Sequence, residues 1–101
     1  TRVYTSPAMR CVQTADSVLD GLAQRDRIAL RMDLALHEPA REKLPIENEE
    51  FFSSAGFYVD RVYCPLLSAD QSEKIVGETR LEYYRRMYFV LRRILEEILL
   101  T

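Results

Sequence analysis

The fold is decided by the stretch VYTSPAMRCVQTA at residues 3–15, in which a short strand leads directly into a helix. Ser6 followed by Pro7 is a strong helix start, because Ser is a preferred N-cap and Pro fits the first helical position. Beyond this turn the apolar residues recur at helical spacing, at Cys11, Ala15, Val18 and Leu22. We therefore predict a strand over residues 2–5 and a helix from residue 8 to about residue 24.

The next segment alternates between apolar and polar residues, which is typical of a half-buried strand. One face would carry Ile28, Leu30, Met32, Leu34 and Leu36. The opposite face would carry Arg31 and Asp33. A helix between two strands favours parallel pairing with a right-handed crossover, so the first third of the chain is predicted to be a strand–helix–strand unit of an α/β fold.

The rest of the chain is predicted to be irregular up to Gly77, apart from a short helix within residues 47–54. The prolines that interrupt regular structure are Pro39, Pro45 and Pro65. After Gly77 a second long helix is expected, with Glu78 or Thr79 near its cap. Its apolar stripe, which we expect to face a core, consists of Leu81, Tyr84, Tyr88, Leu91, Leu95 and Ile98.

Composition limits the class of protein. The chain has 101 residues, enough for one domain, and a formal net charge of -2, which excludes a general basic surface for nucleic acid. It has no apolar run near the roughly 20 residues of a membrane span, and we expect no secretory signal. Cys11 and Cys64 lack metal-ligand spacing, so we expect two reduced, partly buried thiols in a cytoplasmic protein without a metal site.

Arg10 is the first candidate functional residue. It lies in the first turn of the expected helix, where a cation is disfavoured by roughly 0.3–1 kcal/mol unless an anion binds. With an anion present, free backbone N–H groups, the helix dipole and the guanidinium fork converge on it. The turn from Thr5 to Arg10 is therefore a candidate phosphate site, with Arg10 and Ser6 as candidate ligands. An exposed arginine that points away from the helix end is the alternative.

Glu38 is the second candidate, because it follows the second predicted strand and keeps the parity of its buried face. Ligands of open α/β sheets bind beyond the carboxyl ends of the strands, and both Arg10 and Glu38 follow such ends. A carboxyl group there could act as general acid to a leaving oxygen. A loop glutamate with a capping role is the alternative. His37, the only histidine, is interpreted as structural or exposed.

The pattern Ser-Pro-x-x-Arg-x-x-Gln-Thr-Ala at residues 6–15 resembles the histidine phosphatase superfamily, also called phosphoglycerate-mutase-like. Within it the chain looks most like the phosphatase domain of the suppressors of T-cell receptor signalling and their invertebrate relatives. Three further segments are similar to that branch: Leu36-His37-Glu38, the Val-Asp-x-x-Tyr-x-Pro pattern at residues 59–65, and Gly77-Glu78-Thr79.

The resemblance implies an α/β fold that is part of a three-layer domain, with a mostly parallel sheet and flanking helices. Residues 1–101 are then expected to be the central part of a single domain. The family transfers phosphate to a histidine in an early Arg-His-Gly motif and completes its pocket with a later histidine. Neither motif occurs in this chain, and His37 matches neither position. By resemblance Arg10 clamps the phosphate, Glu38 is the acid/base, and no cofactor is implied.

The first hypothesis is therefore a phosphomonoesterase fragment, inactive by itself, whose intact domain works through a phosphohistidine. Its substrate would be a phosphotyrosine protein, a steroid phosphate or a small phosphorylated metabolite. The alternative is a catalytically inactive phosphate-binding or scaffold module of the same fold, and homodimer formation is left open in both cases. Phosphoglycerate mutase activity is a third, weaker hypothesis, disfavoured by analogy through Leu-x-Glu and Val-Asp-x-x-Tyr-x-Pro.

Overall fold

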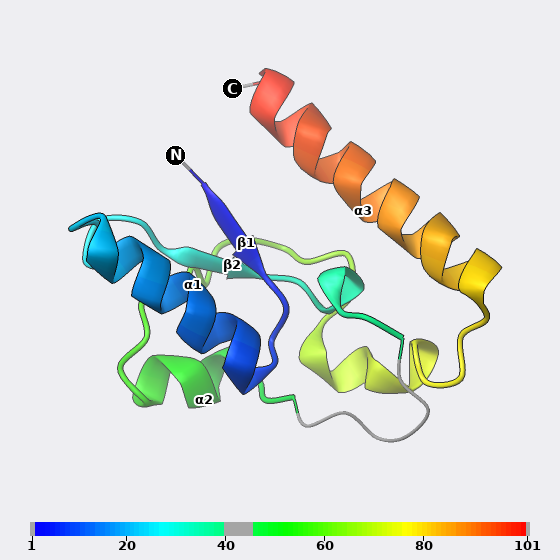
Figure 1. Ribbon diagram of the computed structural model, residues 1–101, viewed down its shortest axis with the longest axis horizontal. Helices are drawn as coiled ribbons and strands as arrows, with labels where there is room; N and C mark the ends of the chain where they lie inside the picture. Colours follow the sequence, from blue (N-terminus) through cyan, green and yellow to red (C-terminus); the bar gives the residue numbers. More distant parts are fainter. Residues whose placement is uncertain (1, 40–45, 101) are drawn as a thin grey trace.

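The computed structural model describes residues 2–39 and 46–100, so Pro45, one of the expected breaks, lies outside the described residues. In chain order the elements are β1 (Val3–Thr5), α1 (Met9–Gly21), β2 (Leu30–Met32), the 3₁₀ turn η1 (Leu34–Leu36), α2 (Glu49–Ser54), the 3₁₀ segment η2 (Ala69–Lys74) and α3 (Arg80–Leu100). Figure 1 shows α1 and α2 on one side of the two strands and α3 on the other.

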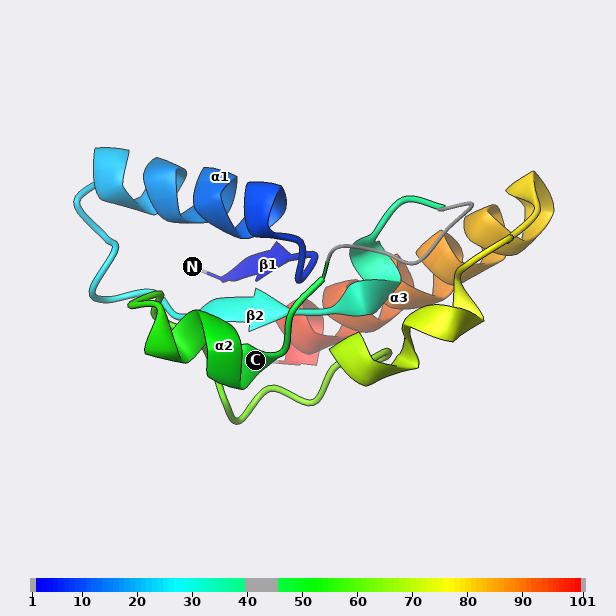
Figure 2. The same ribbon diagram turned by 90° about the horizontal axis from the view of Figure 1, so that it is seen from below.

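The two strands pair in parallel, as the sequence predicts. Val3 lies opposite Leu30, and Thr5 lies opposite Met32. α1 connects the strands and stacks over them in Figure 2, which confirms the strand–helix–strand unit. Because the strands run in the same direction, the segments that follow Thr5 and Met32 leave the same edge of the sheet.

The main core lies between α1, β2 and α2. Its buried members are Val12, Leu19, Leu30, Met32, Phe52 and Val59. A second, smaller cluster joins Leu34 to Ile75 and packs η1 against the end of η2. Most of the main core therefore comes from α1 and β2, and the later part of the chain adds Phe52 and Val59 to it.

The predicted strand over residues 28–36 is wrong beyond Met32, because Asp33 turns the chain. Asp33 is fully buried rather than solvent-facing, and its carboxylate accepts the backbone N–H of Ala35 at 3.0 Å. It also accepts a hydrogen bond of 2.7 Å from the hydroxyl of Tyr63 and backbone N–H bonds from Leu66 and Leu67. A carboxylate at this position caps a 3₁₀ turn, so the alternation that follows it no longer describes a strand.

The predicted bounds of the first helix are also corrected. Its N-cap is Ala8, which makes no side-chain cap, so Ser6 and Pro7 lie before the helix rather than at its cap and first position. The hydroxyl of Ser6 instead contacts the Nδ1 atom of His37. The helix ends at Gly21 rather than near Gln24, because Ala23 adopts a left-handed φ of 57° that stops helical propagation.

The remaining helices begin close to where the sequence places them. Asn48 caps α2 by accepting the backbone N–H of Phe51 at 2.8 Å. Thr79 and Glu82 form a capping box at the start of α3, each side chain accepting the backbone N–H of the other. Within the described residues, no helix combines the length and apolar content needed to cross a membrane.

The predicted inward face of α3 is wrong. The residues expected to face the core are at least half exposed: Leu81, Tyr84, Tyr88, Leu91, Leu95 and Ile98. The helix instead turns Arg86 and Val90 inward, and both are buried. Arg86 sets this orientation because its guanidinium group reaches the carbonyl oxygen of Ala35 in η1 at 2.6 Å.

The expectation of two partly buried thiols holds only for Cys11. Cys64 is exposed, and neither cysteine forms a disulfide. Cys64 lies in the loop that Tyr63 ties to Asp33, and its side chain faces outward from that loop. Among the described residues no group of three or more His, Cys, Asp or Glu side chains is placed to hold a metal ion.

Candidate functional site

The structure brings Arg10 and Glu38 together. Arg10 lies in the first turn of α1 after β1, and Glu38 follows η1 after β2, so both extend from the same edge of the sheet. An Nη atom of Arg10 lies 2.5 Å from a carboxylate oxygen of Glu38. Their side chains are 58% and 66% exposed, so solvent reaches both groups. The pair places a cation and a proton donor or acceptor within reach of one ligand.

The local backbone geometry that places Glu38 beside Arg10 differs from the predicted one. It is exposed and does not continue the buried face of β2, because the strand ends at Met32 and η1 resets the side-chain parity. The carboxylate is available to solvent for the same reason. The sequence reasoning therefore placed Glu38 at the right edge of the sheet with the wrong local geometry.

Beneath the Arg10–Glu38 pair lies a buried contact that the sequence did not predict. The Oγ atom of Ser6 and the Nδ1 atom of His37 are 2.6 Å apart, and the two residues are 6% and 2% exposed. Burial lowers the pKa of His37, and the positive charge of Arg10 lowers it further, while Glu38 opposes the shift. The imidazole is therefore held neutral near pH 7.

The loop between α2 and η2 owes its shape to two polar residues of the Val-Asp-x-x-Tyr-x-Pro pattern. Asp60 accepts the backbone N–H groups of Val62 and Tyr63 and pairs with Arg31 at 3.2 Å. The hydroxyl of Tyr63 donates to the buried Asp33. Burial and that carboxylate raise the pKa of Tyr63 well above its usual value. These residues hold the loop in place and do not approach Arg10.

A hollow of about 430 Å³ borders Arg10 on the α1–β1 side. It is lined by Tyr4, Thr5, Arg10, Cys11, Thr14 and Ala15. The hydroxyl of Thr14 donates to the carbonyl oxygen of Arg10 at 2.8 Å, which orders the first turns of the helix around it. The hollow lies beside the guanidinium group, and neither Glu38 nor Ser6 is among its lining residues.

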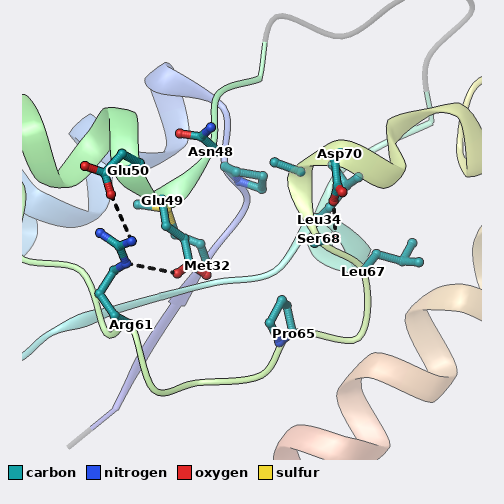
Figure 3. Close-up of a pocket in the computed structure, with 12 residues that line it drawn as sticks. Met32, Leu34, Asn48, Glu49, Glu50, Arg61, Pro65, Leu67, Ser68 and Asp70 are labelled. Carbon is teal, nitrogen blue, oxygen red and sulfur yellow. Dashed lines mark hydrogen bonds and ion pairs between the residues drawn. The ribbon is translucent and has the colours of Figure 1, made fainter.

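A separate hollow of about 390 Å³ lies between β2, α2 and η2 and does not include Arg10 or Glu38. Figure 3 shows its polar side chains, with Arg61 directed at Glu49 and Glu50. Arg61 is the one cation among its described lining residues, and its charge is already met by these carboxylates. The described residues that line this hollow therefore include no free cation that could hold a phosphate group.

The parallel strand–helix–strand unit, with Arg10 and Glu38 at one edge of it, defines a histidine phosphatase fold, and the chain belongs to the histidine phosphatase superfamily. It is 35% identical to the human ubiquitin-associated and SH3 domain-containing protein B, in an alignment that covers 94% of its length. It is 34% identical over 83% of its length to the ecdysteroid-phosphate phosphatase of Bombyx mori.

A solved structure agrees with these relatives. The chain matches the ecdysone phosphate phosphatase of Bombyx mori in complex with tungstate, with a TM-score of 0.81 and 28% identity over 95% of its length. It spans 37% of that solved chain and 15% and 13% of the two curated relatives. No family model matches the chain.

Sequence reasoning missed two residues that shape this site. His37 was interpreted without a specific role, yet it joins the two site-bearing segments. Asp33 was expected on a solvent face, yet it holds the loop between α2 and η2. The one sequence signal for Asp33 is its place as a lone carboxylate among apolar residues.

Proposed function

We propose that the chain is the central part of a histidine phosphatase domain that hydrolyses phosphomonoesters through a phosphohistidine intermediate. The observation that carries this proposal is the contact between Arg10 and Glu38 at the edge where both parallel strands end. Opposite charges from two different segments meet there in solvent, beside a hollow of suitable size. The exposed apolar stripe of α3 supports a larger domain that covers it.

In this mechanism Arg10 clamps the phosphate. Its guanidinium fork can donate to two phosphate oxygens at once and stabilises the negative charge that develops during transfer. Ser6 is a proposed second ligand. Its hydroxyl has one donor and two acceptor positions, so the bond to His37 leaves capacity for a ligand.

Glu38 is proposed to handle the protons. In the first step a histidine supplied by flanking sequence attacks phosphorus, the P–O ester bond breaks, and Glu38 gives its proton to the leaving oxygen. In the second step water attacks the phosphohistidine. Glu38 takes a proton from that water, the P–N bond breaks, and inorganic phosphate leaves. The proton balance closes over the two steps.

The substrate class is proposed from the relatives, two of which carry names that refer to a steroid phosphate. We propose a phosphate ester of an aromatic or steroid alcohol, including phosphotyrosine, acted on by a cytoplasmic enzyme. No metal or organic cofactor enters the mechanism, because phosphoryl transfer to an imidazole needs only a cationic clamp and a proton donor.

The test uses the full-length protein in which this sequence occurs. Hydrolysis of p-nitrophenyl phosphate should be detectable, and Arg10→Ala should lower kcat by at least about a hundredfold, the usual cost of removing an anion-stabilising donor. Arg25→Ala is the matched control, because Arg25 is also a partly exposed arginine in an ion pair, with Asp16. Its turnover should match that of the wild type.

Two results would contradict the proposal. Turnover that survives Arg10→Ala unchanged would remove Arg10 from the site. Binding of phosphate without turnover by the wild-type protein would instead favour the inactive phosphate-binding module.

A further inference from the structure

The attraction between Arg10 and Glu38 is too weak to fix the distance between their side chains. Both side chains are more than half exposed, and such pairs contribute little because they must give up side-chain entropy and are screened by solvent. The separation of the two groups must therefore be set by the backbone segments that carry them. Each segment needs an anchor near its functional side chain.

A buried anchor lies directly next to Glu38. His37 is 2% exposed, its backbone N–H donates to the carbonyl oxygen of Leu34 at 2.9 Å, and its ring contacts Ser6. Ser6 in turn lies four positions before Arg10, in the turn that leads from β1 into α1. The Ser6–His37 contact thus joins the segment that carries Arg10 to the segment that carries Glu38 through the protein interior.

We propose that His37 is a positioning residue which, through its hydrogen bond to Ser6, sets where the carboxyl group of Glu38 lies relative to a phosphate held by Arg10. This inference rests on the proposed phosphatase function. The ring is buried and does not itself touch the substrate. It aligns the proton donor with the leaving oxygen.

The charges around His37 fit this role. Burial is the main cause that lowers the pKa of His37, the charges of Arg10 and Arg86 lower it further, and the charge of Glu38 opposes the shift. A neutral ring adds no positive charge that would draw Glu38 away from Arg10. It also keeps the contact with Ser6 an ordinary buried hydrogen bond, which is geometrically more demanding than an exposed ion pair.

The role predicts a selective defect. A misplaced Glu38 delivers its proton poorly, and proton delivery matters most when the leaving oxygen is strongly basic. Phenyl phosphate needs this proton much more than p-nitrophenyl phosphate does, because nitrophenolate leaves readily. Binding of the phosphate by Arg10 is unaffected, so the loss should appear in kcat rather than in KM.

The experiment measures kcat and KM of the full-length protein with both substrates. His37→Phe keeps the ring volume and removes the bond to Ser6, and it should lower kcat for phenyl phosphate about tenfold more than kcat for p-nitrophenyl phosphate. His37→Asn, whose amide can still bond to the hydroxyl of Ser6, should restore most of the difference. In a Ser6→Ala background, His37→Phe should cause no further loss, because the bond is already gone.

Equal losses on the two substrates, or an undiminished effect of His37→Phe in the Ser6→Ala background, would overturn the inference. If His37→Phe fails to fold, Ser6→Ala carries the comparison through the ratio of kcat for the two substrates, because loss of Ser6 as a proposed phosphate ligand acts on both substrates alike. Arg10→Ala and Glu38→Gln separate this inference from the proposed function. If both impair turnover while the His37 variants leave the substrate ratio unchanged, only the positioning role fails. If neither impairs turnover, the proposed function fails.

Discussion

At the scale of single residues, the chain places opposite charges where two parallel strands end. Arg10 and Glu38 are 28 positions apart in sequence, and they meet because the parallel pairing of β1 and β2 sends both following segments to one edge. A buried serine and histidine lie close to them. Charge at the surface and hydrogen bonding beneath it are thus supplied by different residues of the same two segments.

The neutral state of His37 gives the protein a pH-dependent stability. The folded state resists protonation of a ring whose pKa is lowered, whereas the unfolded chain protonates near the ordinary value of 6.5. Stability is therefore fully present above about pH 6.5 and is lost as the pH falls toward the lowered pKa. Denaturant unfolding at about pH 7.5 and about pH 5.5 should show this loss in the wild-type protein and a smaller loss in His37→Asn. Equal losses in both would contradict this explanation.

Arg10 and Glu38 could be predicted from the sequence, but the buried Ser6–His37 contact beneath them could not. Arg10 was identified from its place in a helix start, and Glu38 from its place after a strand, both of which are local signals. The partnership of Ser6 with His37 joins positions 31 apart and leaves no periodic trace in the sequence. Whether Ser6 also binds phosphate, and whether Arg10 and Glu38 act as proposed, remain predictions.

At the scale of elements, the buried pair of Arg86 and Glu78 fixes α3 against η1. The guanidinium group of Arg86 makes two hydrogen bonds to the carboxylate of Glu78, at 2.6 and 2.8 Å, and a third to Ala35. Both side chains are less than one tenth exposed. The pair therefore determines which face of the helix turns inward, overriding the hydrophobic pattern.

Removing one member of this pair should be costly, because it leaves a buried charge without its partner. Arg86→Met should lower the free energy of unfolding of the full-length protein by about 3–5 kcal/mol, and adding Glu78→Leu should recover much of that loss. Arg92→Met is the matched control, since Arg92 pairs with Glu96 on the exposed side of α3 and its loss should leave the free energy of unfolding close to that of the wild type. A double variant no more stable than Arg86→Met would show that the uncompensated charge is not the cause.

Element boundaries followed the sequence where caps and periodicity agreed. The capping box of Thr79 and Glu82 and the cap of Asn48 are local signals, and α3 and α2 begin beside them. The prediction of a strand over residues 28–36 failed because Asp33 bonds to a loop 30 and 33 positions later, which no local pattern encodes. The prediction of the inward face of α3 failed because the apolar stripe does not indicate that Arg86 is buried.

At the scale of the whole molecule, side chains of α3 tie the helix to the sheet, to η1 and, through Arg93, to the backbone carbonyl of Cys64. Near its end, Glu97 accepts hydrogen bonds from Tyr4 and Arg31, and Arg31 lies over the rings of Tyr4 and Tyr63. Nearer its start, Arg86 donates hydrogen bonds to Glu78 and to the carbonyl oxygen of Ala35 in η1. The apolar stripe of α3 stays exposed in the described chain, which fits the proposal that further segments of a larger domain cover it.

The central claim is that the turn ending at Arg10 holds a tetrahedral oxyanion, and titration of the full-length protein with tungstate tests it most directly. A solved relative is in complex with this ion. The Arg10→Ala variant loses charge-assisted hydrogen bonds worth about 1.5–3 kcal/mol. Its affinity for tungstate should therefore be roughly ten- to a hundredfold lower than that of the wild type. Arg25→Ala should bind tungstate as the wild type does. Equal affinity of Arg10→Ala and the wild-type protein for tungstate would contradict the account.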